Sequence, residues 1–277
     1  MTHLAPEPTG TPVRLGVLGP LSLVVDGEDR TPSAPKPRRL LALLMLNANR
    51  TVHACDCITE LWGSDPPKTA VSTLQTYVLC IRQILRDTTD HSHTLVTRNQ
   101  GYQLTVYPEA SDRLRFEHLA RRGLDASIGG EPAVASALLA RALDVWRGPV
   151  LADVPHGTLS SAHVVHLEEA RSSVLQWRIE ADLGLGRHRE LLDELEGLAA
   201  AHPTHENVQA QFMLALHRSG LSDRALAVYR GLHDRLGDTF GIEPVPRLRR
   251  LYEAIAADDP VLTTPPATLS RGTVFLQ

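Results

Sequence analysis

One segment constrains the fold of this chain more than any other: the run from Lys68 to Arg86, which follows two consecutive prolines. Apolar residues recur in it every three or four positions, as they do on one side of an α-helix. They are Val71, Leu74, Val78, Ile81 and Leu85. The opposite side is small and rich in hydroxyl groups, with Thr69, Ser72, Thr73, Thr76, Leu79, Cys80 and Gln83. The pattern predicts a helix that buries its apolar stripe and can bring its other face close to a groove.

The elements before this helix can be placed from turn and break signals. Residues 13–25 (VRLGVLGPLSLVV) are rich in β-formers, and Asp26-Gly27 supplies a hairpin turn. Three prolines then break the chain ahead of the amphipathic run Arg38–Leu46, which predicts a first helix. A second, short helix fits Asp56–Trp62, because a glycine and two prolines follow it closely.

A β-hairpin is expected after the third helix. In residues 95–106 (LVTRNQGYQLTV) two β-type runs flank the turn Asn99-Gln100-Gly101, which places Arg98 and Asn99 near the tip. Strands, then three helices, then a hairpin is the order of a winged helix. In that fold the third helix enters the major groove of DNA, and the hairpin, called the wing, reaches the flanking backbone or minor groove.

The second half of the chain reads as helix almost throughout. Candidate helices cover residues 112–127, 131–147, 160–185, 187–201, 205–219, 221–237 and 245–257, with short Gly or Pro breaks between them. Small residues where paired helices would cross suggest degenerate tetratricopeptide-like stacking. We therefore expect an α+β winged-helix domain at residues 13–108 and an all-α domain at 112–258. Residues 1–12 are expected to form a flexible arm, and residues 259–277 a flexible tail.

Charge is distributed unevenly along the chain. The net charge is −4, which by itself argues mildly against a nucleic-acid partner. Between Lys36 and Arg86, however, seven Lys and Arg residues face three Asp and Glu residues, a local charge of +4. An acidic protein can therefore still carry a basic face toward DNA.

Other functional classes find less support. No apolar run approaches the roughly 20 residues of a membrane span, and with no export signal we expect a cytoplasmic protein. Phosphate-binding, dinucleotide-binding, nucleophile-elbow and zincin motifs are absent, so we expect no enzyme and no cofactor. Cys55 and Cys57 form one short pair without a second, which favours buried core thiols over a metal site. His163, His166, His202 and His205 are expected to be surface histidines.

Candidate DNA contacts come from the third helix, the entrance to the first helix and the wing. Thr73 and Thr76 are placed to touch base edges or phosphates, although ordinary surface hydroxyls would give the same pattern. Cations at the start of the first helix are placed to bind DNA phosphates, although an ordinary solvent-exposed run of charges would give the same pattern. The full candidate set is Lys36, Arg38, Lys68, Ser72, Thr73, Thr76, Arg82, Gln83, Arg98 and Asn99.

Several blocks of sequence, taken in order, resemble those of the Streptomyces antibiotic regulatory protein family. In the first half they are LGPLSL (18–23), LLALLMLNANRTV (40–52), ELWGSDPP (60–67), STLQTYV (72–78) and GYQL (101–104). In the second half they are ALDVWRGPVLADV (142–154), LEEAR (167–171), MLALHRSG (213–220), ALAVYRGLHDRL (225–236) and GIEPVPRLRRLYEAI (241–255). The resemblance covers nearly the whole chain, and the combination is more specific than any one block.

The resemblance implies a response-regulator-type winged helix followed by a bacterial transcriptional activation domain. It implies a sequence-specific activator of a secondary-metabolite (antibiotic) biosynthetic gene cluster. Such a protein would bind direct repeats in promoter DNA, associate with itself there and contact RNA polymerase, including its sigma factor. Repeats arranged head to tail imply heterologous contacts between copies rather than a two-fold axis.

The sequence departs from the family pattern on the third helix. Cys80 and Gln83 stand where the pattern supplies cations, so fewer phosphate contacts are expected. This departure keeps an alternative open, in which the winged helix has lost DNA binding and the helical repeats act as a protein-interaction scaffold.

Overall fold

The computed structural model describes residues 13–86 and 93–262, so the expected arm at 1–12 lies outside the described residues. The chain divides into two compact units, which we describe separately. Unit 1 comprises residues 1–120 and 141–173, and unit 2 comprises residues 121–140 and 174–277. These divisions fall within helices, whereas the sequence led us to expect one boundary between residues 108 and 112.

Unit 1 begins with a small antiparallel sheet. Its strands β1 (Val13–Gly16), β2 (Ser22–Val25) and β3 (Glu28–Asp29) lie side by side in chain order. Asp26 and Gly27 join β2 to β3 with positive φ angles of 49° and 86°, a backbone twist that suits a tight hairpin. The expected turn is therefore present.

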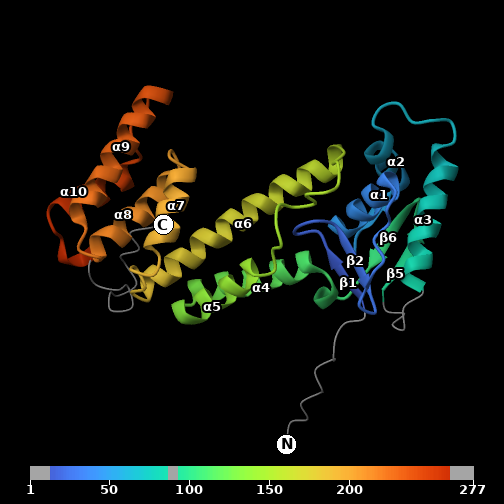
Figure 1. The fold of residues 1–277 in the computed structure, drawn as a ribbon, viewed down its shortest axis with the longest axis horizontal. Coiled ribbons are helices and arrows are strands. Elements are labelled where there is room, and N and C mark those ends of the chain that lie inside the picture. The colour runs from blue at the N-terminus through green and yellow to red at the C-terminus, as the bar shows by residue number, and fades with distance from the viewer. Residues whose placement is uncertain (1–12, 87–92, 263–277) are drawn as a thin grey trace, which may run out of the picture. The chain divides into compact units, whose positions relative to one another are not determined.

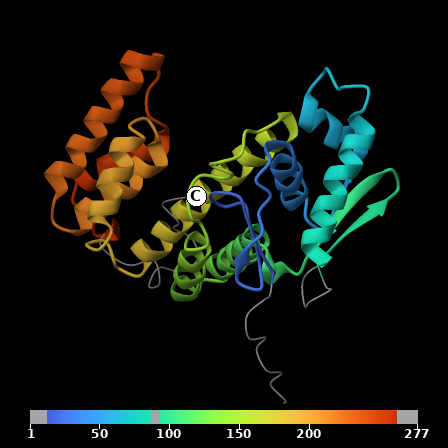
Figure 2. The same cartoon turned by 45° about the vertical axis from the view of Figure 1, so that its right-hand side comes forward.

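Three helices and a second sheet complete the winged helix (Figures 1 and 2). The helices are α1 (Pro35–Leu46), α2 (Ala54–Trp62) and α3 (Ala70–Arg86). The strands are β4 (Thr51–His53), β5 (Thr94–Arg98) and β6 (Gly101–Thr105), paired in the antiparallel order β4-β6-β5. Strands β5 and β6 form the wing beside α3. The element order that the sequence predicts is confirmed.

The core of the winged helix gathers around α1, whose residues from Leu40 to Leu46 are all buried. Helix α3 packs on it with Leu74, Val78 and Ile81 at most 1% exposed. One expected core residue is wrong: Val71 is 59% exposed, and Ala70 is buried in its place at 5%. At 100° per residue the buried residues of α3 span an arc of about 80° between Ala70 and Val78, and Val71 lies just beyond its edge, on the side that faces solvent.

Beyond the wing the chain is helical. A short 3-10 turn (Pro108–Ala110) leads into α4 (Asp112–Ile128), α5 (Pro132–Leu143) and α6 (Thr158–Gly184). The helix expected over 131–147 ends early, at Leu143. The residues that follow bond instead to the loop after β1, because the amides of Arg147 and Leu151 donate to the carbonyls of Leu18 and Val17 at 2.8 and 3.0 Å.

A buried carboxylate ties the winged helix to this helical segment within unit 1. Glu60 of α2 is 1% exposed. Its carboxylate oxygens accept hydrogen bonds from the backbone amides of Gly157, Leu159 and Ser160 at 2.8, 3.0 and 3.3 Å. These are amides of the first turn of α6, which lack partners inside the helix. A Cβ on Gly157 would lie 2.5 Å from this carboxylate, so the close approach requires glycine.

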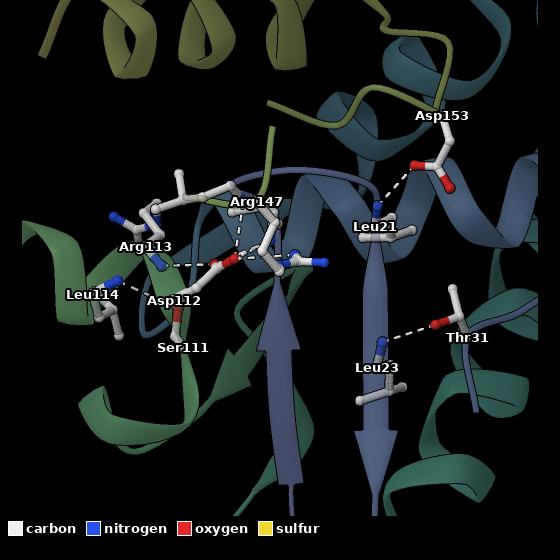
Figure 3. Close-up of polar contacts among 11 residues, drawn as sticks. Leu21, Leu23, Thr31, Ser111, Asp112, Arg113, Leu114, Arg147 and Asp153 are labelled. Carbon is white, nitrogen blue, oxygen red and sulfur yellow. Dashed lines mark hydrogen bonds and ion pairs between the residues drawn. The ribbon is translucent and has the colours of Figure 1, made fainter. Parts of the chain in front are cut away.

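Two further carboxylates fix the first sheet of unit 1 (Figure 3). Asp112 accepts from the amides of Val17 and Leu18 at 2.9 Å and lies 3.3 Å from a guanidinium nitrogen of Arg147. Asp153 accepts from the amide of Leu21 at 2.7 Å. The loop between β1 and β2 is therefore held at both ends by acids from the helical segment, which makes unit 1 continuous across the expected domain boundary.

Unit 2 contains a stack of helices with α8 at its centre. It includes α7 (Leu192–Ala201), α8 (Glu206–Arg218), α9 (Ser222–Phe240) and α10 (Pro246–Ala256). Helix α8 packs against the other three and is buried from Val208 to His217. Short connections join neighbouring helices into hairpins, as in tetratricopeptide-like repeats. The expected fold class, a winged helix followed by an all-helical domain, is confirmed.

The expected flexible tail is wrong in its first residues. Residues 260–262 form a 3-10 turn, and Leu262 is 2% exposed. The carbonyl of Leu262 accepts a hydrogen bond from Arg218 Nε at 2.7 Å. This contact anchors the segment to α8, and residues 263–277 lie outside the described part of the chain.

We predict that Glu60→Gln lowers the free energy of unfolding by about 2 kcal/mol, because a charged acceptor for three amides is replaced by a neutral group. Urea denaturation followed by circular dichroism measures this loss. Glu28→Gln is the matched control, since Glu28 is 69% exposed beside Arg30 and should change stability little. Equal effects of the two substitutions would contradict the structural role of Glu60.

Candidate nucleic-acid interface

Helix α3 presents one continuous exposed face. Its buried side consists of Ala70, Leu74, Val78, Ile81 and Leu85. The exposed residues on and just before the helix are Lys68, Thr69, Val71, Ser72, Gln75, Thr76, Leu79, Gln83 and Arg86. At 100° per residue, Ser72, Thr76, Leu79 and Gln83 cluster at the centre of this face. The sequence-predicted front is thus present around this centre.

Two hydroxyl groups on the exposed face donate hydrogen bonds to backbone carbonyls of the preceding turn. Ser72 Oγ donates to the carbonyl of Thr69 at 3.0 Å, and Thr76 Oγ1 donates to the carbonyl of Ser72 at 3.1 Å. Such back-bonding is common for Ser and Thr in helices. The exposed surface of these residues therefore offers acceptor oxygens and, on Thr76, a methyl group.

The margins of the face are partly covered. Thr73 and Cys80, which the sequence placed on the front, are half-buried. Tyr77 is also half-buried, and its ring stacks on Trp62 of α2 with centroids 6.4 Å apart. The free face of α3 is therefore narrower than the periodicity suggested.

Arg82 connects α3 to the wing. Its Nε donates to the carbonyl of Leu95 at 2.7 Å, and one terminal nitrogen donates to Thr97 Oγ1 at 2.7 Å. Both acceptors belong to β5. Two directed hydrogen bonds from a planar guanidinium fix orientation as well as distance, so Arg82 sets the position of the wing relative to α3.

The wing ends in a tight turn of two residues. Arg98 pairs with Gly101 across the hairpin, and Asn99 and Gln100 between them have φ angles of 30° and 64°. Positive φ at both positions is the geometry of a type I′ turn, which Asn favours. Arg98 and Asn99 are both exposed at the tip, as the sequence predicted.

Two candidate cations at the start of α1 bind protein groups within unit 1. Lys36 Nζ donates to the carbonyl of Leu61 at 3.1 Å and lies 4.5 Å from the centroid of the Trp62 ring. Burial lowers the pKa of Lys36 below its ordinary value. Arg38 forms an ion pair with Asp153 and donates to the carbonyl of Pro32 at 3.2 Å. Neighbouring Arg39 donates to the carbonyls of Pro155 and Glu60.

The Lys and Arg residues of this region thus fall into two groups. Lys36, Arg38 and Arg82 contact protein groups, whereas Lys68, Arg86 and Arg98 are exposed around α3 and the wing. Sequence reasoning missed Val71 and Gln75 on the exposed face. The signal that could have found Val71 is its place at the edge of the apolar stripe, about 20° beyond Val78 and farther from the stripe centre than any buried residue.

The cysteines and histidines form no metal centre in the described ranges 13–86 and 93–262, where no group of three His, Cys, Asp or Glu residues gathers. Cys57 is buried, and burial raises the pKa of its thiol to about 12, which disfavours the thiolate that metals bind. The expectation of two buried thiols is wrong for Cys55, which is exposed. No described helix combines the length and apolar character that crossing a bilayer requires.

Family models match both halves of the chain. Residues 28–104 match the model described as "Transcriptional regulatory protein, C terminal", and residues 111–256 match the "Bacterial transcriptional activator domain". The first match contains α1 to α3 and most of the wing. The second begins just before α4 and ends with α10.

Similar proteins come from actinobacteria. Regulatory protein DnrI of Streptomyces peucetius is 44% identical over 254 residues, a match that covers 90% of this chain and 93% of that protein. Regulatory protein AfsR of Streptomyces coelicolor is 39% identical over 259 residues, but this chain spans only 26% of its length. Among solved structures, Mycobacterium tuberculosis EmbR in complex with a low affinity phosphopeptide superposes with a TM-score of 0.84 at 32% identity. That superposition covers 89% of this chain and 65% of the EmbR chain.

Proposed function

This chain belongs to the Streptomyces antibiotic regulatory protein family of transcriptional activators, and on that premise we propose that it binds specific promoter DNA to activate a secondary-metabolite (antibiotic) biosynthetic gene cluster. Its relatives are named as regulators, and the chain is a regulator rather than an enzyme. The proposal concerns what the regulator binds and which genes it controls.

One observation carries the proposal: the exposed face of α3 and the tip of the wing belong to one winged helix and are tied together by Arg82. A recognition helix needs one face packed on the core and one face exposed to enter the groove, and α3 has both. The wing adds an exposed cation, Arg98, where the flanking phosphates would lie.

The candidate residues then take two kinds of role. We assign DNA contact to the exposed members: Lys68, Ser72, Thr76, Gln83, Arg98 and Asn99. Thr73, half-buried at the margin, is assigned a peripheral phosphate contact. Lys36, Arg38 and Arg82 are assigned as positioning residues, because each is held by protein acceptors.

Family membership supports the finer parts of the proposal. These are binding to direct repeats in promoter DNA, self-association of copies on those repeats, and contact with RNA polymerase including its sigma factor. Copies bound to direct repeats face the same way, so neighbours would meet through different surfaces. A double-stranded DNA partner also implies that the protein works in the cytoplasm.

A second candidate function is a protein-interaction scaffold with a degenerate winged helix. Two observations favour it: Cys80 and Gln83 replace expected cations, and Lys36, Arg38 and Arg82 contact protein groups. A scaffold of this kind would bind DNA weakly and without sequence preference.

We predict that the protein protects discrete sites in the promoter DNA of the biosynthetic genes beside its own gene. DNase footprinting at about 150 mM salt, with an unrelated promoter as competitor, measures this protection. Uniform binding to all DNA, or no binding, would contradict the activator proposal and favour the scaffold.

We also predict that Arg98→Ala and Arg82→Ala weaken DNA binding through loss of the same phosphate contact. Loss of one phosphate contact at Arg98 should reduce the slope of log affinity against log salt by about 0.9. Arg82→Ala displaces the wing and Arg98 with it, so it should reduce the slope by the same amount, and adding Arg98→Ala to it should change the slope no further. Titrations of the two single variants and the double variant at four salt concentrations measure these slopes, and an additive slope change in the double variant would refute the positioning role of Arg82.

A further inference from the structure

The centre of the exposed face of α3 lacks charge. Lys68 precedes the helix and Arg86 ends it, and between them lies a single charged residue, Arg82. That guanidinium is bound to Leu95 and Thr97 of the wing. Direct reading of guanine by Arg or Lys, the commonest specific contact in major grooves, is therefore not available from the middle of this helix.

The middle of the face is apolar instead. Leu79 is 51% exposed and lies at the centre, close in angle to Ser72, Thr76 and Gln83. Within residues 13–86 and 93–106, Val71 and Leu79 are the two large hydrophobic side chains that are exposed. Both lie on α3. An apolar side chain in water at this position gains stability only when a partner covers it.

The neighbours of Leu79 reinforce this apolar character. Ser72 and Thr76 donate their hydroxyl protons to backbone carbonyls one turn earlier. Thr76 therefore presents a methyl group rather than a free hydrogen-bond donor. Gln83, one turn further along, supplies an amide that can pair with an adenine edge. The methyl groups of Leu79 and Thr76 and the amide of Gln83 suit A·T base pairs. The hydroxyl oxygens of Ser72 and Thr76 can accept from the adenine amino group of the same pairs.

We propose that Leu79 is a specificity-determining residue that packs against the C5-methyl group of a thymine in the major groove. This inference rests on the proposed function. The thymine methyl is the apolar group that base pairs display in that groove, so it is the matching partner for a central leucine. The binding site should therefore contain a thymine whose methyl group contributes to affinity.

The test begins with a site selected by the wild-type protein from a pool of random DNA duplexes. Each thymine of that site is replaced in turn by deoxyuridine, which removes only the methyl group. We expect one such replacement per recognised repeat to weaken binding about fourfold, the effect of one buried methyl-sized group. With Leu79→Ala, the same replacement should change affinity less than twofold.

Val165→Ala is the matched control. Val165 is an aliphatic residue of α6 that is 58% exposed, and its truncation should leave the uracil sensitivity of the protein intact. Because Leu79 is exposed, Leu79→Ala should also retain the melting temperature of the wild type, which circular dichroism verifies.

The outcomes separate this inference from the proposed function. Selection that yields no preferred sequence would overturn the proposed function and this inference with it. A preferred sequence that tolerates uracil at every position, or one whose uracil sensitivity survives Leu79→Ala, would overturn this inference alone. A change in self-association of Leu79→Ala without DNA, measured by sedimentation, would assign Leu79 to a protein interface and also overturn it.

Discussion

The buried carboxylate of Glu60 is the contact on which the arrangement of unit 1 depends. It lies on α2 yet satisfies the first amides of α6, about a hundred residues later in the chain. Those amides carry the positive end of the helix dipole, which a negative group stabilises. Because α2 packs against α3, with Trp62 stacked on Tyr77, a helix of the second half of the chain thereby supports the proposed recognition helix through α2.

The same region explains how the cations of the winged helix are divided. Arg38 pairs with Asp153, and Arg39 donates to the carbonyls of Pro155 and Glu60. These side chains hold unit 1 together. Cations that bind protein groups within unit 1 are not available to bind DNA phosphates. This agrees with the uncharged centre of the exposed face of α3. In our account, specificity comes from the apolar and amide groups of that face, and the exposed cations around it provide the phosphate contacts.

Local patterns were enough to predict the order of elements, the buried stripe of α3 from Leu74 onward and the turn at Asn99. These features depend on residues close in sequence, whose spacing reflects helical or strand geometry. The exposure of Val71 is not predicted, because Val71 fits the apolar spacing but lies at the edge of the buried stripe. At the end of a helix, whether a residue at the edge of the stripe is buried depends on the neighbouring elements, which the spacing does not show.

The roles of Lys36, Arg38 and Arg82 could not be predicted in this way. A lysine beside a tryptophan 26 residues away, or an arginine paired with an aspartate 115 residues away, leaves no periodic trace in the sequence. The early end of α5 has the same kind of cause, because the loop after it bonds to the loop between β1 and β2. Contacts between distant segments therefore decide which candidate cations remain exposed.

We propose that the exposed face of α3 lies in the major groove of specific DNA. A photo-crosslinking amino acid placed at Leu79, and separately at Val165, tests it on a duplex that carries the selected site. We expect crosslinks from position 79 to bases inside the footprint and none from position 165. Absence of base crosslinks from position 79 on DNA that the protein demonstrably protects would contradict it.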